Sequence, residues 1–160
     1  SNAGKYKLHT LFAGDPSDPP LVLIHGHSMN SSFWYRNIDE FVKMGYYVIA
    51  FDLLGWGRSD RPEFTKGTVE DCLTFFVGSF NAWRITLELT SFSIVSHSIG
   101  AYVAYEYARL YPKTVKRLTM LCPAAIEKRV TLYRAVYFTL TPQVSLMLLK
   151  EGATVPLPCK

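Results

Sequence analysis

FSIVSHSIGAYVAYEYARL, residues 92–110, decides the fold of this sequence. Its first residues form a short apolar run, which predicts a β-strand that is buried on both faces. A helix is predicted over residues 99–111, and it stops where Pro112 interrupts it. SHSIG, residues 96–100, joins the two elements, so Ser98 lies at the point where a strand gives way to a helix.

The same alternation of strands and helices extends over the rest of the chain. Besides the strand at 92–95, strands are predicted at residues 5–12, 21–24, 46–51 and 115–121. One helix is predicted from a cap at Ser31 or Ser32 to about Met44, and a longer one from a cap at Thr68 to about Leu89. Strands that alternate with helices predict an α/β fold with a doubly wound, mostly parallel sheet.

The length of 160 residues fits one domain with one core. Ser1-Asn2-Ala3 resembles an expression scar and is excluded from the fold. The predicted division is residues 1–4 as a disordered scar, 5–126 as the α/β core, 127–150 as the start of apolar cap or lid helices, and 151–160 as an unstructured tail.

The composition, 49% hydrophobic and 14% aromatic, indicates a globular protein. The net charge of +4 comes from scattered lysines and arginines, so no nucleic-acid partner is expected. No run of 18 or more apolar residues is present, so no bilayer span is predicted. Cys72, Cys122 and Cys159 lack metal-site spacing, which predicts reduced thiols in an intracellular, cytoplasmic protein without a metal or cofactor.

Ser98 is the candidate nucleophile. A sharp turn between a strand and a helix holds such a residue in a strained backbone conformation and needs small neighbours two positions away. Gly100 meets this need, and Ser96 stands where glycine is usual. His97 adjoins Ser98, and its side chain is expected to pack away from the hydroxyl. The alternative reading of Ser98 is a helix-capping serine at the end of a strand.

Two backbone amides are candidates for an oxyanion hole. One is the amide of Ile99, and the other is that of His27 in the HGHSMN loop that follows the LVLI strand. Together they would bind the oxyanion of a tetrahedral intermediate, and losing one such donor costs about 3 kcal/mol. His25 and Gly26 open the same loop, and we expect the His25 ring to bond the loop backbone.

Four other residues near the predicted strand ends are interpreted as structural. Asp52 ends a strand and is expected to brace the loop Gly55–Ser59. Arg58 is expected to pair locally. Trp34 and Trp56 are expected to pack in the core, with a role in lining an acyl pocket as the alternative.

Five segments of the chain carry a family resemblance: PPLVLIHG, FWYRNIDEF, AFDLLGWGRSDRPEF, FVGSFNAWR and SIVSHSIGAYVAYEYARLYPKTVKRL. Together they resemble the α/β-hydrolase family, and most closely its ABHD4/ABHD5 (CGI-58-like) branch of lipid hydrolases. DLLGWGRSDRP and the pair Trp83-Arg84 are the most specific. The resemblance spans about residues 7–126 and is weaker in LYRAVYFTLTP.

The resemblance implies a lipid substrate. One member of the branch carries asparagine at the nucleophile position and acts as a non-catalytic lipase coactivator, and another carries serine and is similar to phospholipid acyl hydrolases. Ser98 therefore favours hydrolysis of fatty-acyl (phospho)lipid esters or amides, of the lysophospholipase or N-acyl phospholipid lipase type. A membrane or lipid-droplet surface is implied as a partner. The chain departs from the branch at Ser96 and in the less glycine-rich pair His27-Ser28.

The partners of a serine nucleophile are missing from the sequence. In this fold they follow it in the order acid, then histidine. No histidine follows His97 and no aspartate follows Asp71, and the last two strands and the HxxxxD motif of the family are also missing. We expect an inactive amino-terminal part of a hydrolase that ends in the cap region, through truncation, as a short isoform or through a damaged gene. An exposed sheet edge at residues 115–121 would then predict self-association.

Two alternative functions are considered. A non-catalytic lipid-associated scaffold or lipase coactivator would use the same fold without a reactive serine. Epoxide hydrolysis and haloalkane hydrolysis usually need aspartate at the turn, so Ser98 argues against these two reactions.

Overall fold

The computed structural model describes residues 6–64 and 68–124. The chain divides into two units, residues 1–126 and 127–160, and all described residues belong to the first. Several predictions lie outside the described residues: the scar at 1–4, the cap helices at 127–150, the tail at 151–160 and the state of Cys159.

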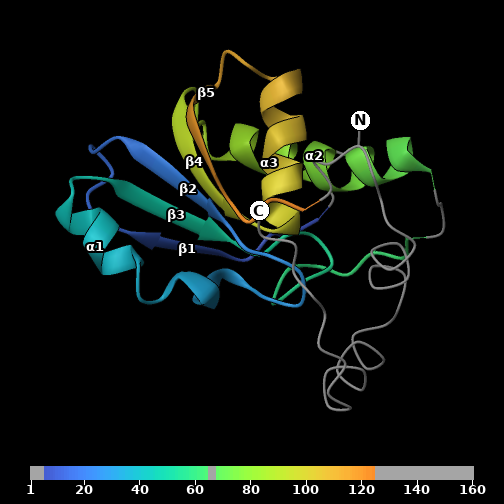
Figure 1. The fold of residues 1–160 in the computed structure, drawn as a ribbon, viewed down its shortest axis with the longest axis horizontal. Helices are drawn as coiled ribbons and strands as arrows, with labels where there is room; N and C mark the ends of the chain where they lie inside the picture. The colour runs from blue at the N-terminus through green and yellow to red at the C-terminus, as the bar shows by residue number, and fades with distance from the viewer. Residues whose placement is uncertain (1–5, 65–67, 125–160) are drawn as a thin grey trace, which may run out of the picture. The chain divides into compact units, whose positions relative to one another are not determined.

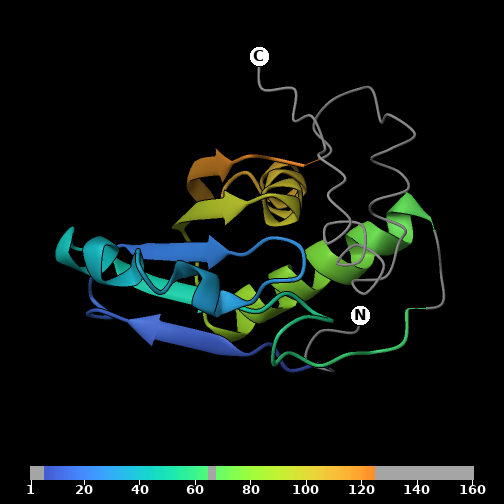
Figure 2. The same ribbon diagram turned by 60° about the horizontal axis from the view of Figure 1, so that its bottom comes forward.

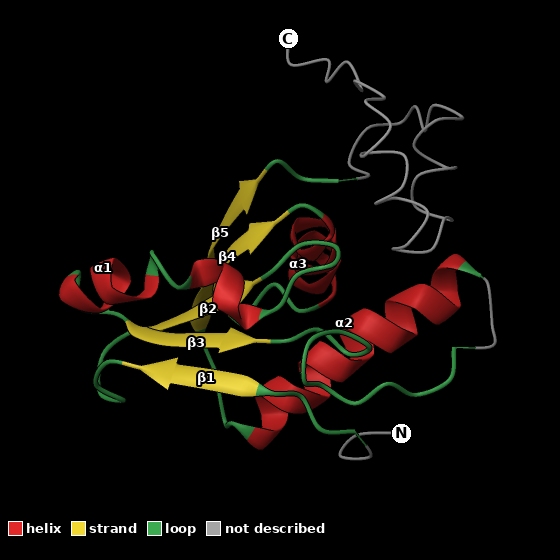
Figure 3. Cartoon of the chain, turned by 90° about the horizontal axis from the view of Figure 1, so that it is seen from below, coloured by secondary structure: helices red, strands yellow, loops and turns green. Residues whose placement is uncertain are grey.

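The described residues form a five-stranded sheet with the order β1-β3-β2-β4-β5, in which the strands lie side by side as Figure 3 shows. The strands are β1 (Thr10–Ala13), β2 (Pro20–Ile24), β3 (Tyr47–Phe51), β4 (Phe92–His97) and β5 (Val115–Leu121). β2 pairs in parallel with β3 and β4, and β4 with β5, whereas β1 runs antiparallel to β3 (Figure 2). The predicted α/β fold with a mostly parallel sheet is therefore confirmed.

β1 is shorter than predicted and begins at Thr10 rather than Lys5. The residues before β1 form hydrogen bonds with the loop after β3 rather than with a neighbouring strand. The N–H of Lys7 donates to the Asp60 carboxylate at 2.7 Å, and the N–H of His9 donates to Ser59 Oγ at 3.0 Å. These side chains accept the backbone N–H groups that a longer β1 would use to pair with β3.

The first predicted helix is divided into a 3₁₀-helix, η1 (Ser31–Trp34), and α1 (Ile38–Lys43). Its predicted cap was wrong. The cap is Asn30, whose side chain accepts the N–H of Ser32 at 2.9 Å. Ser31 and Trp34 are both buried, because three residues per turn place them on the same side of a 3₁₀-helix.

The two longer helices follow the sequence more closely. α2 (Val69–Thr86) begins at the predicted cap, where Thr68 and Asp71 bond each other's backbone in a capping box. It ends three residues before the predicted Leu89. α3 (Ile99–Leu110) follows β4 directly (Figure 1).

The period of two along the strands divides the buried residues between the two faces of the sheet. Val22, Ile24, Ile49 and Phe51 pack with residues of α2 and α3. Leu21, Leu23, Val48 and Ala50 pack on the other face, against Trp34 of η1 and residues of α1. The sheet is therefore covered on both faces, which is the doubly wound arrangement.

This arrangement defines where a ligand is expected. β2 leads to η1 and α1 on one face, and its neighbour β4 leads to α3 on the other. Adjacent strands whose connections leave to opposite faces make a topological switch point, and ligands bind outside the carboxyl ends of such strands. The loop after Ile24 and the turn at Ser98 meet at this point.

Candidate active site

Ser98 forms a strained turn between β4 and α3. Its φ of 54° and ψ of −118° lie in a region that residues with a side chain rarely adopt. The turn is held by the N–H of Ser98, which donates to the Leu121 carbonyl at 3.0 Å, and by the Ser98 carbonyl, which accepts the N–H of Ala101 at 3.1 Å. Ser98 is half-buried. Its backbone therefore makes the sharp, strained strand-to-helix turn that the sequence predicts for this residue.

Gly100 allows α3 to begin against the end of β2. A Cβ atom at this position would overlap the carbonyl oxygen of His25 and would lie 2.9 Å from Ile24 Cγ2. No residue larger than glycine fits this contact without moving the backbone. The close approach of β2 therefore requires glycine at position 100, the second small residue of the turn.

Ser96 occupies the first small position and is fully buried. Its side chain lies on the same face of the sheet as Ile94, which packs in the core with α2 and α3. The hydroxyl donates to the Thr119 carbonyl of β5 at 3.2 Å. A serine is accommodated here because the neighbouring strand supplies an acceptor for the hydroxyl.

His97 points to the opposite face, toward η1. Its ring stacks on Phe33, with ring centroids 4.8 Å apart and planes 25° apart. Nδ1 is buried and has no hydrogen-bond partner among the described residues. It faces Gly26, where a Cβ atom would lie 2.6 Å from it. Burial lowers the pKa of His97, which favours the neutral form of the ring.

His25 links two loops and is completely buried. Its Nε2 accepts the N–H of Leu53 at 2.9 Å, which leaves the proton on Nδ1, and Nδ1 donates to the Gly26 carbonyl at 2.8 Å. Burial is the main cause that lowers the pKa of His25. With both ring nitrogens bonded, this histidine joins the loop after β2 to the loop after β3.

Asp52 braces the loop after β3. Its carboxylate accepts the N–H groups of Ser31 and of Arg58, the latter at 2.8 Å. Burial raises the pKa of Asp52, but these hydrogen bonds outweigh it and hold the pKa below 3.8. The bond to Arg58 is made by its backbone N–H, and the Arg58 side chain is exposed. A Cβ atom at Gly57 would overlap the carboxylate.

The candidate oxyanion donors lie at the start of two segments. Ile99 is the first residue of α3, and the first N–H groups of a helix have no partner within the helix. On the other side, the His27 ring lies edge-on to Trp56 at 4.8 Å, and its Nδ1 is 2.9 Å from Ser28 Oγ. Burial lowers the pKa of His27. Ser28 has a φ of 57°, so this loop also contains a strained residue.

Sequence reasoning missed two contacts of this site. The first is Phe33 on His97, and nothing in the sequence indicates it. The second is a hydrogen bond from the N–H of Ala124 to the Ser98 carbonyl at 3.1 Å, beside Cys122 with its φ of 45°. Trp34, predicted to be in the core, is 2% exposed.

Within residues 6–64 and 68–124, no group of three histidine, cysteine or acidic side chains is arranged to hold a metal ion. No helix in the same residues is long and apolar enough to cross a bilayer.

Substitution of Ser98 tests the strain in the turn. Ser98→Gly should raise the free energy of unfolding by about 1 kcal/mol, because a strain of about 1–3 kcal/mol is relieved and part is offset by the entropy of glycine. Ser98→Ala keeps the strain and should change stability by less than about 0.5 kcal/mol. Urea unfolding measures both. If Ser98→Gly is less stable than Ser98→Ala, the backbone at this position is not strained.

The lowered pKa of His25 predicts a loss of stability in acid. Below its ordinary pKa of 6.5, the unfolded chain binds a proton that the folded chain does not, so the free energy of unfolding falls as the pH decreases. The slope is at most about 1.4 kcal/mol per pH unit for one histidine. Urea unfolding at about pH 7.5 and about pH 5.5 measures it. His25→Gln should be less stable than the unsubstituted chain at the higher pH, and its free energy of unfolding should fall less between the two pH values. An equal fall in both proteins would show that His25 does not cause the acid sensitivity.

The sequence pattern of the family described as the alpha/beta hydrolase fold matches residues 19–143. A protein of Oryza sativa subsp. japonica named probable 1-acylglycerol-3-phosphate O-acyltransferase is 39% identical over 72% of this chain and 28% of its own length. The rat 1-acylglycerol-3-phosphate O-acyltransferase ABHD5 is 35% identical over 71% of this chain and 32% of its own. A human (lyso)-N-acylphosphatidylethanolamine lipase is 36% identical over 70% of this chain and 32% of its own.

The chain thus spans less than a third of these curated relatives, with coverages of 28% and 32%. Among solved structures, a 2-hydroxy-6-oxo-6-phenylhexa-2,4-dienoate hydrolase from Rhodococcus sp. strain RHA1 superposes with a TM-score of 0.68 and 26% identity. The superposition covers 74% of this chain and 43% of that hydrolase. With its strained turn at the switch point of a doubly wound sheet, the chain belongs to the alpha/beta hydrolase fold family, and its curated relatives are of the ABHD4/ABHD5 type.

Proposed function

We propose that Ser98 is the nucleophile of a site that transfers or hydrolyses fatty-acyl groups of lipids. The observation that carries this proposal is the backbone of Ser98, with φ 54° and ψ −118° at the carboxyl end of β4. Such a turn raises the serine hydroxyl above the sheet and leaves the following N–H available. A serine that only capped the helix would accept an N–H of its first turn, and no side-chain cap bond is formed here.

The chemistry follows from these positions. Ser98 Oγ attacks the acyl carbonyl, and its proton passes to a base as the C–O bond forms. The N–H groups of Ile99 and His27 donate to the oxygen that becomes negatively charged. The intermediate then expels the protonated leaving group and leaves an acyl-serine ester. Attack by water completes hydrolysis, whereas attack by a lipid hydroxyl completes acyl transfer.

The base is not His25 or His97. Both nitrogens of His25 are bonded to backbone groups, and His97 packs on Phe33 and Gly26. In this fold the acid and the histidine follow the nucleophile, and no histidine follows His97 in the 160 residues. We therefore propose that these 160 residues alone have little or no turnover and carry the nucleophile and oxyanion part of the site.

The names of the relatives support the substrate class. The rat relative is named for acyl transfer to 1-acylglycerol-3-phosphate, and the human relative is named a lipase of (lyso)-N-acylphosphatidylethanolamine. Both names refer to acylated phospholipids. We propose esters or amides of this class as substrates, presented at a membrane or lipid-droplet surface, for an intracellular, cytoplasmic protein.

A second candidate function is a non-catalytic lipid-associated scaffold or lipase coactivator. The departures from the branch at Ser96 and in the pair His27-Ser28 favour it, because they alter the turn and the loop that would supply the oxyanion donors. The two functions differ in whether Ser98 can react.

Chemical rescue with imidazole tests the reactivity of Ser98. The 160-residue chain should react slowly with an alkyl fluorophosphonate at Ser98, and added imidazole, as an external base, should accelerate the reaction several-fold. Mass spectrometry of peptides locates the adduct. Ser98→Ala should abolish it, and Ser17→Ala, at an exposed serine in the loop between β1 and β2, should not. An intact chain that resists labelling even with imidazole would favour the scaffold.

Turnover gives a second readout. Since loss of a catalytic histidine costs about a factor of 10⁶ in a serine protease, the unassisted chain should hydrolyse p-nitrophenyl esters at the same background rate as Ser98→Ala. Rapid hydrolysis that depends on Ser98 would reveal a base that these contacts do not explain.

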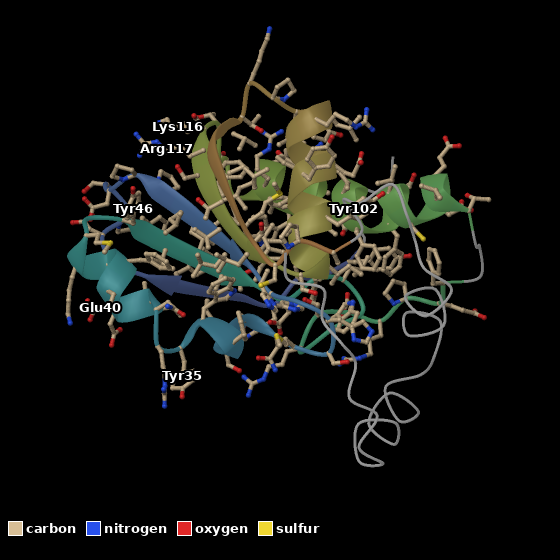
Figure 4. The ribbon with its side chains drawn as sticks, viewed as in Figure 1. Tyr35, Glu40, Tyr46, Tyr102, Lys116 and Arg117 are labelled. Carbon is tan, nitrogen blue, oxygen red and sulfur yellow. The ribbon has the colours of Figure 1, made fainter. Side chains whose placement is uncertain are left out.

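We also propose that the edge of β5 mediates self-association. β5 pairs only with β4 within the described residues. Its charged residues Lys116 and Arg117 lie near its start (Figure 4), so the end of this edge strand, at Met120 and Leu121, carries no charge. The apparent mass in size-exclusion chromatography should rise with protein concentration. Leu121→Lys, at a side chain that is 43% exposed, should reduce the rise, because a charge opposes edge pairing. Leu110→Lys on α3 is the matched control, and a monomer at every concentration would refute the proposal.

A further inference from the structure

Gly26 brings the loop after β2 against the side chain of Ser98. A Cβ atom on Gly26 would lie 3.1 Å from Ser98 Cβ, so the backbone of this loop lies directly beside the proposed nucleophile. The peptide between Gly26 and His27 is trans, so its C=O and N–H point in opposite directions. The carbonyl accepts two hydrogen bonds, from His25 Nδ1 at 2.8 Å and from the N–H of Met29 at 3.3 Å. The His27 N–H, the proposed oxyanion donor, thus belongs to a peptide that is held at its other end.

The side chain of His27 is held by Trp56. The two rings meet edge to face, with centroids 4.8 Å apart and planes at 73°. His27 Nδ1 also lies 2.9 Å from Ser28 Oγ, and Ser28 has a φ of 57°. A strained residue of this kind keeps its conformation only where its surroundings enforce it. The Trp56 ring supplies such support from a different loop.

Trp56 is fixed by the backbone of the loop after β3. Its N–H donates to the Leu53 carbonyl at 2.9 Å, and its carbonyl accepts the N–H of Ser59 at 3.0 Å, so two tight turns meet at this residue. The residues on either side, Gly55 and Gly57, have φ of 88° and 50°, which glycine adopts without steric cost. The half-buried indole also packs against the core that contains α2 and α3. The loop therefore carries the indole on a rigid base.

We propose that Trp56 is a positioning residue for the oxyanion donor, because its ring holds His27 and thereby the N–H that faces the carbonyl oxygen of the substrate. The proposal rests on the roles proposed for Ser98 and His27. It divides the support of one peptide between two residues: His25 fixes the carbonyl of Gly26, and Trp56 fixes the side chain that follows the N–H. Loss of the indole leaves the donor present but poorly aimed. Such a change lowers the rate of attack by Ser98 rather than the affinity for an acyl compound.

The rate of fluorophosphonate labelling with added imidazole tests this role. Trp56→Ala should lower the maximal rate constant at Ser98 by about tenfold, because a misaimed donor loses part of the factor of about 10² or more that one such donor contributes. The probe concentration that gives half the maximal rate should change by less than about twofold. Trp56→Phe keeps an aromatic ring beside His27 and should be labelled within about threefold of the unsubstituted rate.

His27→Ala removes the same ring contact from its other partner. It should lower the rate as much as Trp56→Ala, and the double variant should be no slower than either single variant, because both changes remove one interaction. His27→Ala also serves if Trp56→Ala fails to fold. Phe12→Ala is the matched control, since it removes one ring from another partly exposed aromatic pair, Phe12 and Tyr47, and should leave the rate unchanged. Additive effects in the double variant would contradict the proposal.

Hydrogen exchange separates this proposal from the reactivity of Ser98. In Ser98→Ala, NMR measures the exchange of the Met29 N–H, whose bond to the Gly26 carbonyl closes the loop. Trp56→Ala should speed this exchange by about fivefold and leave that of the Phe33 N–H in η1 unchanged. If the unsubstituted chain is labelled, an unchanged labelling rate in Trp56→Ala overturns the proposal. If it is not labelled, the nucleophilic role of Ser98 fails, and an unchanged exchange rate at Met29 overturns the role of Trp56 as well.

Discussion

The structure depends on the close contact between Gly100 and the carbonyl oxygen of His25. The first turn of α3 lies directly on the end of β2, and no side chain fits between them. This contact sets where the helix begins, and the preceding residue must then turn sharply to connect it to β4. The positive φ of Ser98 follows from the packing of these two elements rather than from any preference of serine.

The same edge of the sheet collects most of the strained backbone. A residue with positive φ follows each parallel strand: Ser28 after β2, Gly55 after β3, Ser98 after β4 and Cys122 after β5. Hydrogen bonds between loops maintain this arrangement. His25 joins the first two loops, and the N–H of Ala124 joins the last two at the Ser98 carbonyl. Strain of this kind persists only where the surroundings enforce it, which is typical of functional sites.

Local signals in the sequence predicted most of the fold. The strands follow from apolar runs, and the cap at Thr68 is a local feature, since its partner Asp71 lies only three residues along the chain. The cap of the first helix was missed because three consecutive residues, from Asn30 to Ser32, are all good caps. The choice between them depends on the bond of Ser31 to Asp52, which only the folded chain brings together.

The candidate site shows the same division. The turn at Ser98 could be predicted because the small residues that mark it lie within five positions, although the contact that enforces it joins Gly100 to His25. The stacking of Phe33 on His97 could not, because it joins the 3₁₀ turn of one connection to the end of a different strand. It depends on the pleat of β4, which directs Ser96 to one face of the sheet and His97 to the other.

Ser96 has a consequence for how hydrolases are recognised. The glycine-x-serine-x-glycine signature treats its first glycine as indispensable, but here the Thr119 carbonyl receives the hydroxyl of a larger residue. The adjoining strand thus decides which residues this position tolerates. Searches that accept serine at this position would recover members of the fold family that the strict signature overlooks.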